Sequence, residues 1–314
     1  MDRPHILVLS RYTAELDQRL KASFDVHRVD DERVPWEEIR AVATSGKGHQ
    51  LDTALLGRLP NLELVASYSA GIESVDTEAL AARGVPITTP SALLADDVAD
   101  VAFGLLLAVG RRLVVADRYV RQGKWPSGPM PLTHRVWGRR LGIVGLGAIG
   151  RAVALRAQAF SMELAYFGPR PRSDCSYVYY PQLGDLARWA DVLVVSCPGG
   201  AATRHLIDAE VLKCLGPDGW LINVARGTIV DETALLNVLA ADQVGGVGLD
   251  VHEYEPRVSE VLRADDRVVL LPHIGSATFE TRLAMADHLV GTLKRALASE
   301  SSTRPSASNE GNIG

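Results

Sequence analysis

Short runs rich in β-branched and apolar residues alternate along this chain with segments of helical periodicity. This alternation is typical of parallel α/β architecture, in which each helix returns the chain to the same edge of a sheet. With 314 residues the chain is long enough for two such domains. The predicted strands form two sets, first His5–Ser10, Val26–Val29, Ala41–Ser45, Leu62–Ser67 and Pro86–Thr88, and then Leu141–Val144, Leu164–Phe167, Val192–Ser196, Trp220–Val224, Gly246–Asp250 and Val268–Leu271.

A glycine-rich turn marks the start of the second set. Gly145, Gly147 and Gly150 follow the apolar run Leu141–Val144 and precede a helical pattern that begins at Arg151. In this strand–turn–helix context the G-x-G-x-x-G spacing strongly indicates dinucleotide binding, because the glycines let backbone approach a pyrophosphate at the helix amino end. The alternative is a structural turn whose glycines serve no ligand.

The expected fold class is α/β, with a doubly wound Rossmann-type cofactor domain and a smaller flavodoxin-like α/β substrate domain. One long helix is predicted from Asp96 to about Gln122, ahead of the second set of strands. A last helix, from about Phe279 to Leu297, is expected to pack back on the first domain, with a hinge at the two crossings. The domains would then be residues 97–276 for the cofactor, and residues 1–96 with 277–314 for the substrate.

Composition argues against several kinds of partner. The net charge of −5 disfavours nucleic acid, and the three cysteines have neither metal-ligand spacing nor the number typical of secreted domains. The longest apolar helical stretch, Val98–Val109, is shorter than the roughly 20 residues that a membrane span requires. The amino terminus does not resemble a signal peptide. We therefore expect a cytoplasmic protein without a metal ion, and a disordered tail over Ser299–Gly314.

The strand after the glycine motif predicts which dinucleotide binds. NAD sites place an acidic residue at its end, about 20 residues after the glycines, to bind the ribose 2′-hydroxyl. Tyr166–Ser173 contains no acidic residue, and Glu163 lies at the opposite end of the strand. Arg170, Arg172 and the Ser173 hydroxyl suit a 2′-phosphate, which arginine binds bidentately. This favours NADPH, with NADH also usable; the alternative is a pair of solvated arginines.

Arg226, Glu255 and His273 each lie at or just past the end of a predicted strand of the second set. Because the carboxyl ends of parallel strands share one edge, where ligands bind, we expect these three side chains to meet. Arg226 would hold a carboxylate with its planar fork and also lean on a keto oxygen. His273, which changes charge near neutral pH, would deliver a proton. The neighbouring carboxylate of Glu255 would favour the charged imidazolium.

These residue types support reduction of a 2-keto acid, which needs a cation for the carboxylate, an acid for the developing alkoxide and a hydride from a cofactor. Reduction should fall as pH rises, because His273 must be protonated, and oxidation should respond in the opposite sense. Each residue also has a structural alternative. Arg226 could form a surface salt bridge, His273 could be a hydrogen-bonded loop histidine, and Glu255 before Pro256 could be a turn or helix-start acid.

Two loops add further candidates. Ser69-Ala70-Gly71 follows a strand of the first set, and the N–H groups of Ala70 and Gly71 could form a nest for the substrate carboxylate. The alternative is a simple turn between strand and helix. The Pro- and Gly-rich segment Lys124–Pro131 either reaches a partner subunit or is an ordinary surface loop with a packed Trp125.

Four phrases of the sequence resemble the D-2-hydroxyacid dehydrogenase family, over about residues 5 to 298. The branch it looks most like contains the NADPH-using glyoxylate and hydroxypyruvate reductases and the hydroxyphenylpyruvate reductases. Members are usually homodimers, joined through the cofactor domain by the long helix and the loop after it, and they typically give the (R)-2-hydroxy acid. The four phrases are Gly145–Gly150, Ala225–Asp231, Gly248–Pro256 and Leu271–Thr278.

The resemblance also assigns roles to single residues. It implies that Arg226 anchors the substrate, that Glu255 and His273 form the acid/base pair, and that Ala70 and Gly71 contact the carboxylate. For the substrate it adds Ser276. For the cofactor it implies contacts with Gly145, Gly147, Ala148, Ile149, Gly150, Arg170, Arg172, Ser173, Cys197, Pro198, Thr203, Val224, Asp250 and Gly275.

The sequence departs from the family in two places that concern the cofactor. Phe167 occupies the acidic position of NAD-using members, which agrees with NADPH. Gly199-Gly200 stands where the family usually has Leu-Thr, which predicts a looser cofactor loop. Two other functions are compatible with the fold: a nucleotide-sensing corepressor similar to the C-terminal-binding proteins, and a dehydrogenase of the same family for another substrate, such as phenylpyruvate or phosphite.

Overall fold

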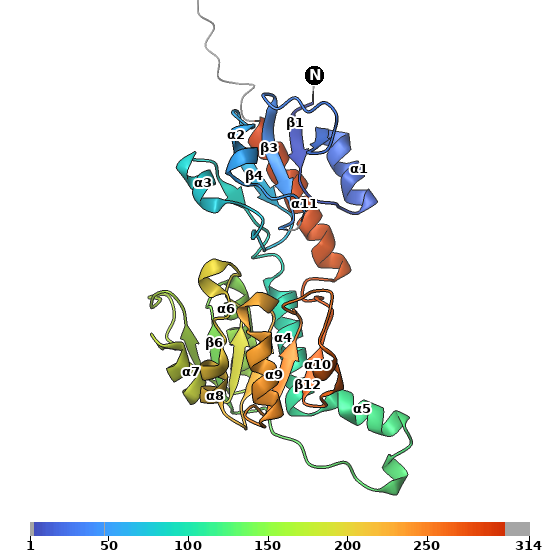
Figure 1. Ribbon diagram of the computed structural model, residues 1–314, viewed down its shortest axis with the longest axis vertical. Coiled ribbons are helices and arrows are strands. Elements are labelled where there is room, and N and C mark those ends of the chain that lie inside the picture. The colour runs from blue at the N-terminus through green and yellow to red at the C-terminus, as the bar shows by residue number, and fades with distance from the viewer. Residues whose placement is uncertain (1–2, 47, 299–314) are drawn as a thin grey trace, which may run out of the picture. The chain divides into compact units, whose positions relative to one another are not determined.

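A computed structural model describes residues 3–46 and 48–298 of the chain (Figure 1). The polar tail predicted over residues 299–314 lies outside the described residues. Within the described ranges, no helix combines the length and the apolar character that a membrane crossing requires.

The chain divides into two compact units, each with its own parallel sheet. Unit 1 ends at Pro90 and resumes at Leu283, and unit 2 is Ser91–Arg282. The sequence had led us to expect the two crossings at residues 96/97 and 276/277, so unit 2 begins earlier and ends later than predicted.

The sheet of unit 1 has five parallel strands in the order β2-β1-β3-β4-β5. This is the order of flavodoxin-like doubly wound sheets, and it confirms the predicted class of fold. The strands are β1 (His5–Val8), β2 (Asp25–Arg28), β3 (Ile39–Thr44), β4 (Leu64–Ser67) and β5 (Ile87–Thr88).

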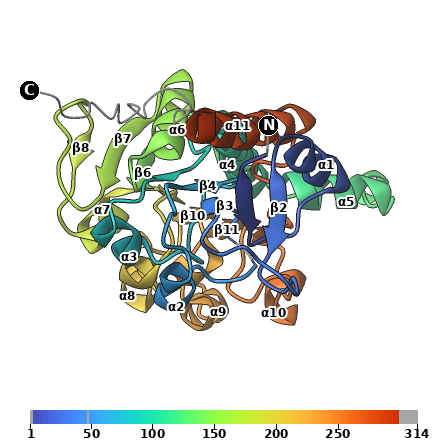
Figure 2. The ribbon, with the colours of Figure 1, turned by 90° about the horizontal axis from the view of Figure 1, so that it is seen from above.

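Four helices cover the two faces of this sheet: α1 (Ala14–Ser23), α2 (Thr53–Gly57), α3 (Thr77–Ala82) and α11 (Phe279–Ala298). Ile6 and Val8 pack into a core with α1 and α11, whereas Leu7 and Leu9 pack into a second core with α2 and α3. Figure 2 shows these helix pairs on opposite sides of the strands. Leu289 of α11 is fully buried in the first core, which confirms that the last helix packs on the first sheet.

The sheet of unit 2 has seven parallel strands in the order β12-β11-β10-β9-β6-β7-β8. The strand order reverses between β6 and β9, which is where doubly wound folds bind dinucleotides. Six strands were predicted; β8 was missed because two residues are too few for a periodic pattern. The strands are β6 (Arg140–Val144), β7 (Glu163–Phe167), β8 (Val178–Tyr179), β9 (Val192–Val195), β10 (Trp220–Asn223), β11 (Gly246–Leu249) and β12 (Val268–Leu270).

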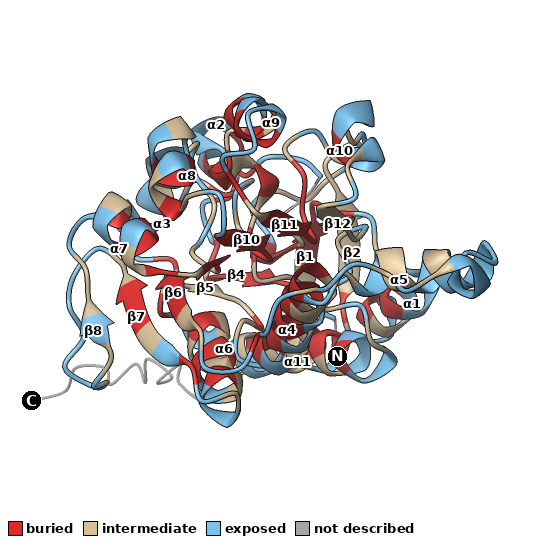
Figure 3. Ribbon diagram, turned by 90° about the horizontal axis from the view of Figure 1, so that it is seen from below, coloured by how far each residue is buried: buried red, intermediate tan, exposed pale blue. Residues whose placement is uncertain are grey.

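Helices also cover both faces of the second sheet. They are α4 (Ala95–Gly110), α5 (Leu113–Arg121), α6 (Ala148–Ala159), α7 (Leu183–Trp189), α8 (Ala209–Leu215), α9 (Glu232–Ala240) and α10 (Glu260–Ala264), with 3-10 turns η1 (Trp125–Ser127), η2 (Ala201–Thr203) and η3 (Gly227–Ile229). The helices α4 and α6 pack together on one face, and α7, α8 and α9 share a core with the strands on the other. Figure 3 shows β10 and β11, in the middle of this sheet, as buried, whereas the edge strand β8 is more exposed.

The single helix predicted from Asp96 to Gln122 is wrong, because the chain breaks after α4. Gly110 ends α4 against the ring of Trp220, and a Cβ on this glycine would lie 2.5 Å from a ring carbon. Arg112 then has a φ of 49°, which turns the chain out of the helical path before α5. As a consequence α5 contains no buried residue.

Candidate active site

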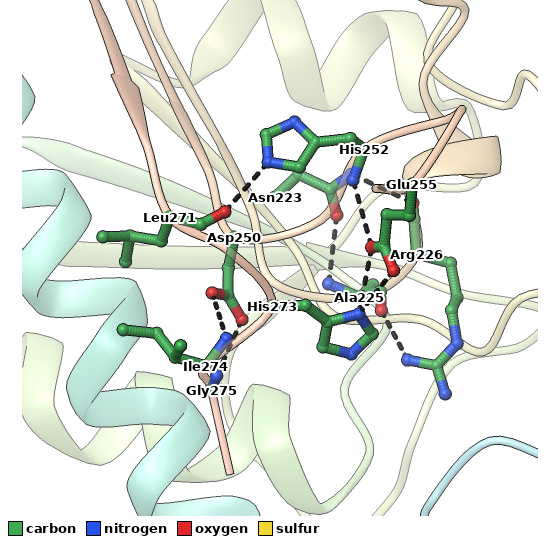
Figure 4. Close-up of polar contacts among 10 residues, drawn as sticks. All are labelled: Asn223, Ala225, Arg226, Asp250, His252, Glu255, Leu271, His273, Ile274 and Gly275. Carbon is green, nitrogen blue, oxygen red and sulfur yellow. Dashed lines mark hydrogen bonds and ion pairs between the residues drawn. The ribbon is translucent and has the colours of Figure 1, made fainter. Parts of the chain in front are cut away.

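Arg226, Glu255 and His273 lie in unit 2, just past the ends of three neighbouring strands, β10, β11 and β12. The strands are parallel and in register, so their carboxyl ends share one edge. Figure 4 shows the Glu255 carboxylate between the backbone of His252 and the ring of His273. In the same view the guanidinium of Arg226 and the imidazole of His273 point to the same side. The three side chains therefore lie at the edge that the strand pattern indicates.

The carboxylate of Glu255 orients the imidazole of His273. Nδ1 of His273 lies 2.9 Å from each carboxylate oxygen. Because an ionised carboxylate can only accept hydrogen bonds, Nδ1 carries the hydrogen and Nε2 is the nitrogen that can exchange a proton with a ligand. Both side chains are partly accessible, 34% for His273 and 26% for Glu255. An imidazole held in this way, with Nε2 left for a ligand, can act as an acid or a base.

Asp250, which follows β11, shapes the turn that carries His273. Its carboxylate accepts hydrogen bonds from the N–H groups of Ile274 and Gly275, both at 2.8 Å, and its carbonyl accepts the N–H of His273 at 2.8 Å. These bonds hold His273 at a φ of 57°, a left-handed conformation that histidine seldom adopts. Asp250 was predicted as a cofactor contact, which stays a prediction; in the structure it positions the His273 turn.

Asn223 fixes the turn that carries Arg226. The fully buried Asn223 side chain accepts the N–H of Ala225 and donates to the carbonyl of Arg226, each at 3.0 Å. A Cβ on Gly227 would lie 1.9 Å from the carbonyl carbon of His252, so the turns after β10 and β11 pack backbone against backbone. The close neighbour of Gly227 is thus the protein's own backbone.

Sequence reasoning missed a buried carboxylate behind this turn. Glu253 has a side chain only 4% exposed, and it pairs with His205 at 2.7 Å and Arg204 at 3.1 Å. It also accepts the N–H of Glu232 at 3.3 Å, and burial raises the pKa of the Glu232 carboxyl beside it. These bonds join the end of η2 to the start of α9. No sequence pattern marks Glu253 as buried, because it belongs to a turn rather than to a periodic element.

The glycine motif fits the pyrophosphate of a dinucleotide. Gly145 has a φ of 94°, and a Cβ on it would lie 2.6 Å from Cα of Cys197, which follows β9. A Cβ on Gly150 would lie 2.3 Å from the carbonyl oxygen of Gly145. Gly147 precedes α6 without a side chain, so the first N–H groups of the helix are directed toward an anion at the turn.

The loop after β9 belongs to the same end of the sheet. Burial raises the pKa of the Cys197 thiol to about 11, which keeps it protonated near neutral pH. The hydroxyl of Thr203 donates to the carbonyls of Pro198 at 2.8 Å and Gly200 at 3.3 Å, so it ties the loop that the two glycines were expected to loosen. The cofactor contacts of this loop, and those of Val224, stay predictions.

The loop after β7 contains an acidic residue that the prediction overlooked. Arg172 does not stand free, because its Nε lies 3.1 Å from a carboxylate oxygen of Asp174. Arg151 of α6 approaches the same carboxylate at 2.7 Å. Hydrogen bonds from Arg172 and Arg151 hold the pKa of Asp174 below its usual range. In NAD sites the acidic residue lies at the end of this strand. Asp174 lies further along the sequence, in the loop after Phe167, so the motif did not predict it.

Ala70 and Gly71 lie in unit 1, in the loop after β4. The hydroxyl of Ser69 donates to the carbonyl of Ser45 at 2.6 Å, and a Cβ on Gly46 would lie 2.4 Å from the carbonyl oxygen of Gly71. The loops after β3 and β4 therefore pack closely at the carboxyl edge of this sheet. Binding of a substrate carboxylate by Ala70 and Gly71 stays a prediction.

The segment Lys124–Pro131 contains η1 and no longer element. Trp125 is 65% exposed in the single chain, so the expectation that its side chain is packed is wrong, whereas both a surface loop and a contact with a partner subunit stay open. Over residues 3–46 and 48–298, no group of three or more His, Cys, Asp or Glu side chains is arranged to hold a metal ion.

A family model described as "D-isomer specific 2-hydroxyacid dehydrogenase, NAD binding domain" matches residues 103–275. Glyoxylate/hydroxypyruvate reductase A of Arabidopsis thaliana is 46% identical over 267 residues, 85% of each chain. Hydroxyphenylpyruvate reductase of Plectranthus scutellarioides is 43% identical over 301 residues, 94% of this chain and 96% of its own. The NADPH-dependent glyoxylate/hydroxypyruvate reductase of Sinorhizobium meliloti, solved with NADP and malonate, has a TM-score of 0.85 and 39% identity, with 95% of both chains covered. The chain is thus an oxidoreductase that belongs to the D-isomer specific 2-hydroxyacid dehydrogenase family.

Proposed function

We propose that this protein uses NADPH to reduce a small 2-keto acid to the (R)-2-hydroxy acid. The observation that carries the proposal is the pair of Glu255 and His273, joined at 2.9 Å on the strand edge that also carries Arg226. The pair supplies a proton donor whose Nε2 can face a ligand, and Arg226 supplies a cation for the substrate carboxylate.

When bound, the nicotinamide supplies the hydride for the carbonyl carbon. Arg226 binds the carboxylate and orients the keto oxygen. The N–H groups of Ala70 and Gly71 are the second candidate for a bond to a carboxylate. His273 delivers the proton from Nε2 to the developing alkoxide. Glu255 stabilises the charged ring before transfer and holds its orientation. In the oxidation direction, neutral His273 accepts the proton from the hydroxyl group.

The choice of NADPH over NADH rests on charge at the end of β7. The strand ends at Phe167, so no acidic side chain occupies its last position, and Arg170, Arg172 and Ser173 follow. Arginine can donate two parallel hydrogen bonds to a phosphate. The solved relative from Sinorhizobium meliloti is an NADPH-dependent enzyme by name and binds NADP, which supports the same choice here.

Steady-state kinetics with glyoxylate, hydroxypyruvate, pyruvate and phenylpyruvate test the proposal. We expect turnover of glyoxylate and hydroxypyruvate, with kcat/KM for NADPH at least about tenfold above NADH, as one charge-assisted hydrogen bond can provide. Chiral analysis of the product should give the (R)-isomer. A kcat/KM for NADH equal to or above that for NADPH would refute the preference for NADPH, but not the reduction of 2-keto acids. If nucleotide binds and no 2-keto acid is reduced, the corepressor alternative replaces the reductase.

We further propose that the enzyme is a cytoplasmic homodimer. Large apolar side chains are exposed along α5 and the segment after it, and exposed apolar surface marks interaction sites. The resemblance places the family's subunit contact on the long helix predicted from Asp96 and on the loop after it. All three cysteines are free thiols, which suits a reducing compartment. The large apolar side chains exposed on α5 and the segment after it are Leu113, Val114, Val120, Trp125, Leu132 and Trp137.

Replacing Leu132 with aspartate is expected to convert a dimer into a monomer. Leu132 is 98% exposed, so the charge costs the single subunit little, whereas in a dimer contact it would be desolvated. Analytical ultracentrifugation at micromolar concentration measures the mass. Val261→Asp is the matched control, since Val261 of α10 is 57% exposed and should leave the dimer intact. A wild-type protein that sediments as a single chain would refute the dimer.

A further inference from the structure

Two guanidiniums share one carboxylate beside the end of β7. Nε and Nη2 of Arg172 lie 3.1 and 3.3 Å from the two oxygens of Asp174, and Nη2 of Arg151 lies 2.7 Å from Oδ2. Arg151 belongs to the first turn of α6, directly after the glycine motif, whereas Arg172 and Asp174 belong to the loop after β7. The carboxylate therefore links this loop to the helix whose amino end fits the pyrophosphate.

The loop backbone places Asp174 at a defined position. The N–H of Arg172 donates to the hydroxyl oxygen of the buried Tyr166 at 2.7 Å. The hydroxyl of Tyr179 donates to the carbonyl of Gly168 at 3.1 Å. The start of the loop at Gly168 is thus bonded to β8, and its middle at Arg172 is bonded to β7. Asp174 follows directly after this anchored part of the loop.

The three charged side chains remain accessible to a ligand. Arg151 is 36% exposed, Arg172 44% and Asp174 57%. Ion pairs at such exposure are weak because water screens them. A phosphate carries more charge than a carboxylate and has three acceptor oxygens, so it can displace Asp174 from a guanidinium. Because the hydrogen bonds from both arginines lower the pKa of Asp174, this side chain keeps its negative charge near neutral pH.

We propose that Asp174 is a specificity-determining residue that competes with the 2′-phosphate of NADPH for Arg172 and Arg151. The inference rests on the proposed function, because it takes the adenosine ribose to bind at the end of β7. With NADH, Asp174 neutralises the two arginines in place of a phosphate. With NADPH, the phosphate takes over Arg172, and the displaced carboxylate remains nearby as a repulsive charge. Asp174 thereby lowers the ratio of kcat/KM for NADPH over NADH, so that NADH remains usable.

Replacing Asp174 with asparagine removes this charge at nearly constant size. Calorimetric titration of the full-length protein with 2′,5′-ADP and with AMP compares two adenosine fragments that differ only in the 2′-phosphate. We expect the Kd of 2′,5′-ADP to fall roughly threefold to tenfold, in keeping with the loss of exposed competing ion pairs, and the Kd of AMP to stay within about twofold. The ratio of kcat/KM for NADPH over NADH should rise by the same factor. The matched control is Asp185→Asn, which removes an exposed carboxylate paired with Arg188 at 2.7 Å and should alter neither Kd.

If the Kd of 2′,5′-ADP and the Kd of AMP changed by the same factor, the proposal would be overturned, because the change would reflect only the altered net charge of the protein. Weaker binding of 2′,5′-ADP would also overturn it, because Asp174 would then be holding the arginines in place for the phosphate. In an Arg172→Ala background the gain from Asp174→Asn should shrink; a full gain there would exclude competition for Arg172.

The wild-type titration separates this inference from the proposed function. Wild-type protein that binds AMP as tightly as 2′,5′-ADP would reject the proposed use of NADPH. A selective gain for 2′,5′-ADP in Asp174→Asn would still support the competition in that case. Turnover of 2-keto acids is measured independently of both titrations.

Discussion

Replacing His273 with asparagine is expected to lower kcat for 2-keto acid reduction roughly 10²–10⁴-fold, the usual contribution of a positioned general acid. Asparagine is the suitable replacement, because the backbone there has a φ of 57° and asparagine adopts such a conformation more readily than alanine. The KM of the keto acid should change much less, since Arg226 still binds the carboxylate. Single-turnover kinetics report the chemical step directly. An unchanged rate would remove His273 from the reaction.

The pH dependence identifies the same group. Reduction consumes a proton that His273 delivers, so wild-type kcat/KM for reduction should fall as pH rises, while oxidation of the hydroxy acid, in which His273 accepts the proton, should rise. In His273→Asn both profiles should flatten. The matched control is His205→Asn, because His205 also has a positive φ of 52° and lies 2.7 Å from the carboxylate of Glu253. Its profiles should keep the wild-type shape; a wild-type profile in His273→Asn would assign the proton transfer to another group.

The strand pattern located Arg226, Glu255 and His273 because each follows an apolar run. Strands of a parallel sheet covered on both faces are continuous apolar runs, and their carboxyl ends necessarily share an edge. Local periodicity was therefore enough to predict this part of the site. The bonds from Asp250 to the turn after β12 were not predictable in the same way. They depend on the register of β11 with β12, which no local pattern encodes.

The features that escaped prediction involve contacts between distant residues. Helical periodicity continues from α4 into α5, and the break between them lies beside Gly110, against which the ring of the distant Trp220 packs. Asp174 lies close to Arg172 in sequence, yet its second partner is Arg151 on another element. In both cases the sequence shows the residue itself, Gly110 or Asp174. Its contact with Trp220 or Arg151 arises only when the chain folds.

Replacing Arg226 with lysine is expected to lower kcat/KM roughly 10²-fold, even though the positive charge is kept. Lysine lacks the planar pair of N–H donors that a carboxylate and a keto oxygen can share. The loss of one or two charge-assisted hydrogen bonds, at about 1.5–3 kcal/mol each, gives this order of magnitude. Both kcat and KM should change, because a bond to the keto oxygen strengthens as the alkoxide develops. Steady-state kinetics with NADPH held at saturation measure the two parameters.

Binding measurements then distinguish a lost anchor from a damaged fold. Oxamate carries the carboxylate and carbonyl of a 2-keto acid, so it should bind Arg226→Lys at least about tenfold more weakly than wild type, whereas NADPH should bind both equally. The turn itself should persist, because Asn223 bonds to the backbone of Arg226 and not to its side chain. Arg188→Lys is the control, since its exposed pair with Asp185 belongs to the same unit. Undiminished oxamate binding would exclude Arg226 as the anchor and assign the carboxylate to the N–H groups of Ala70 and Gly71.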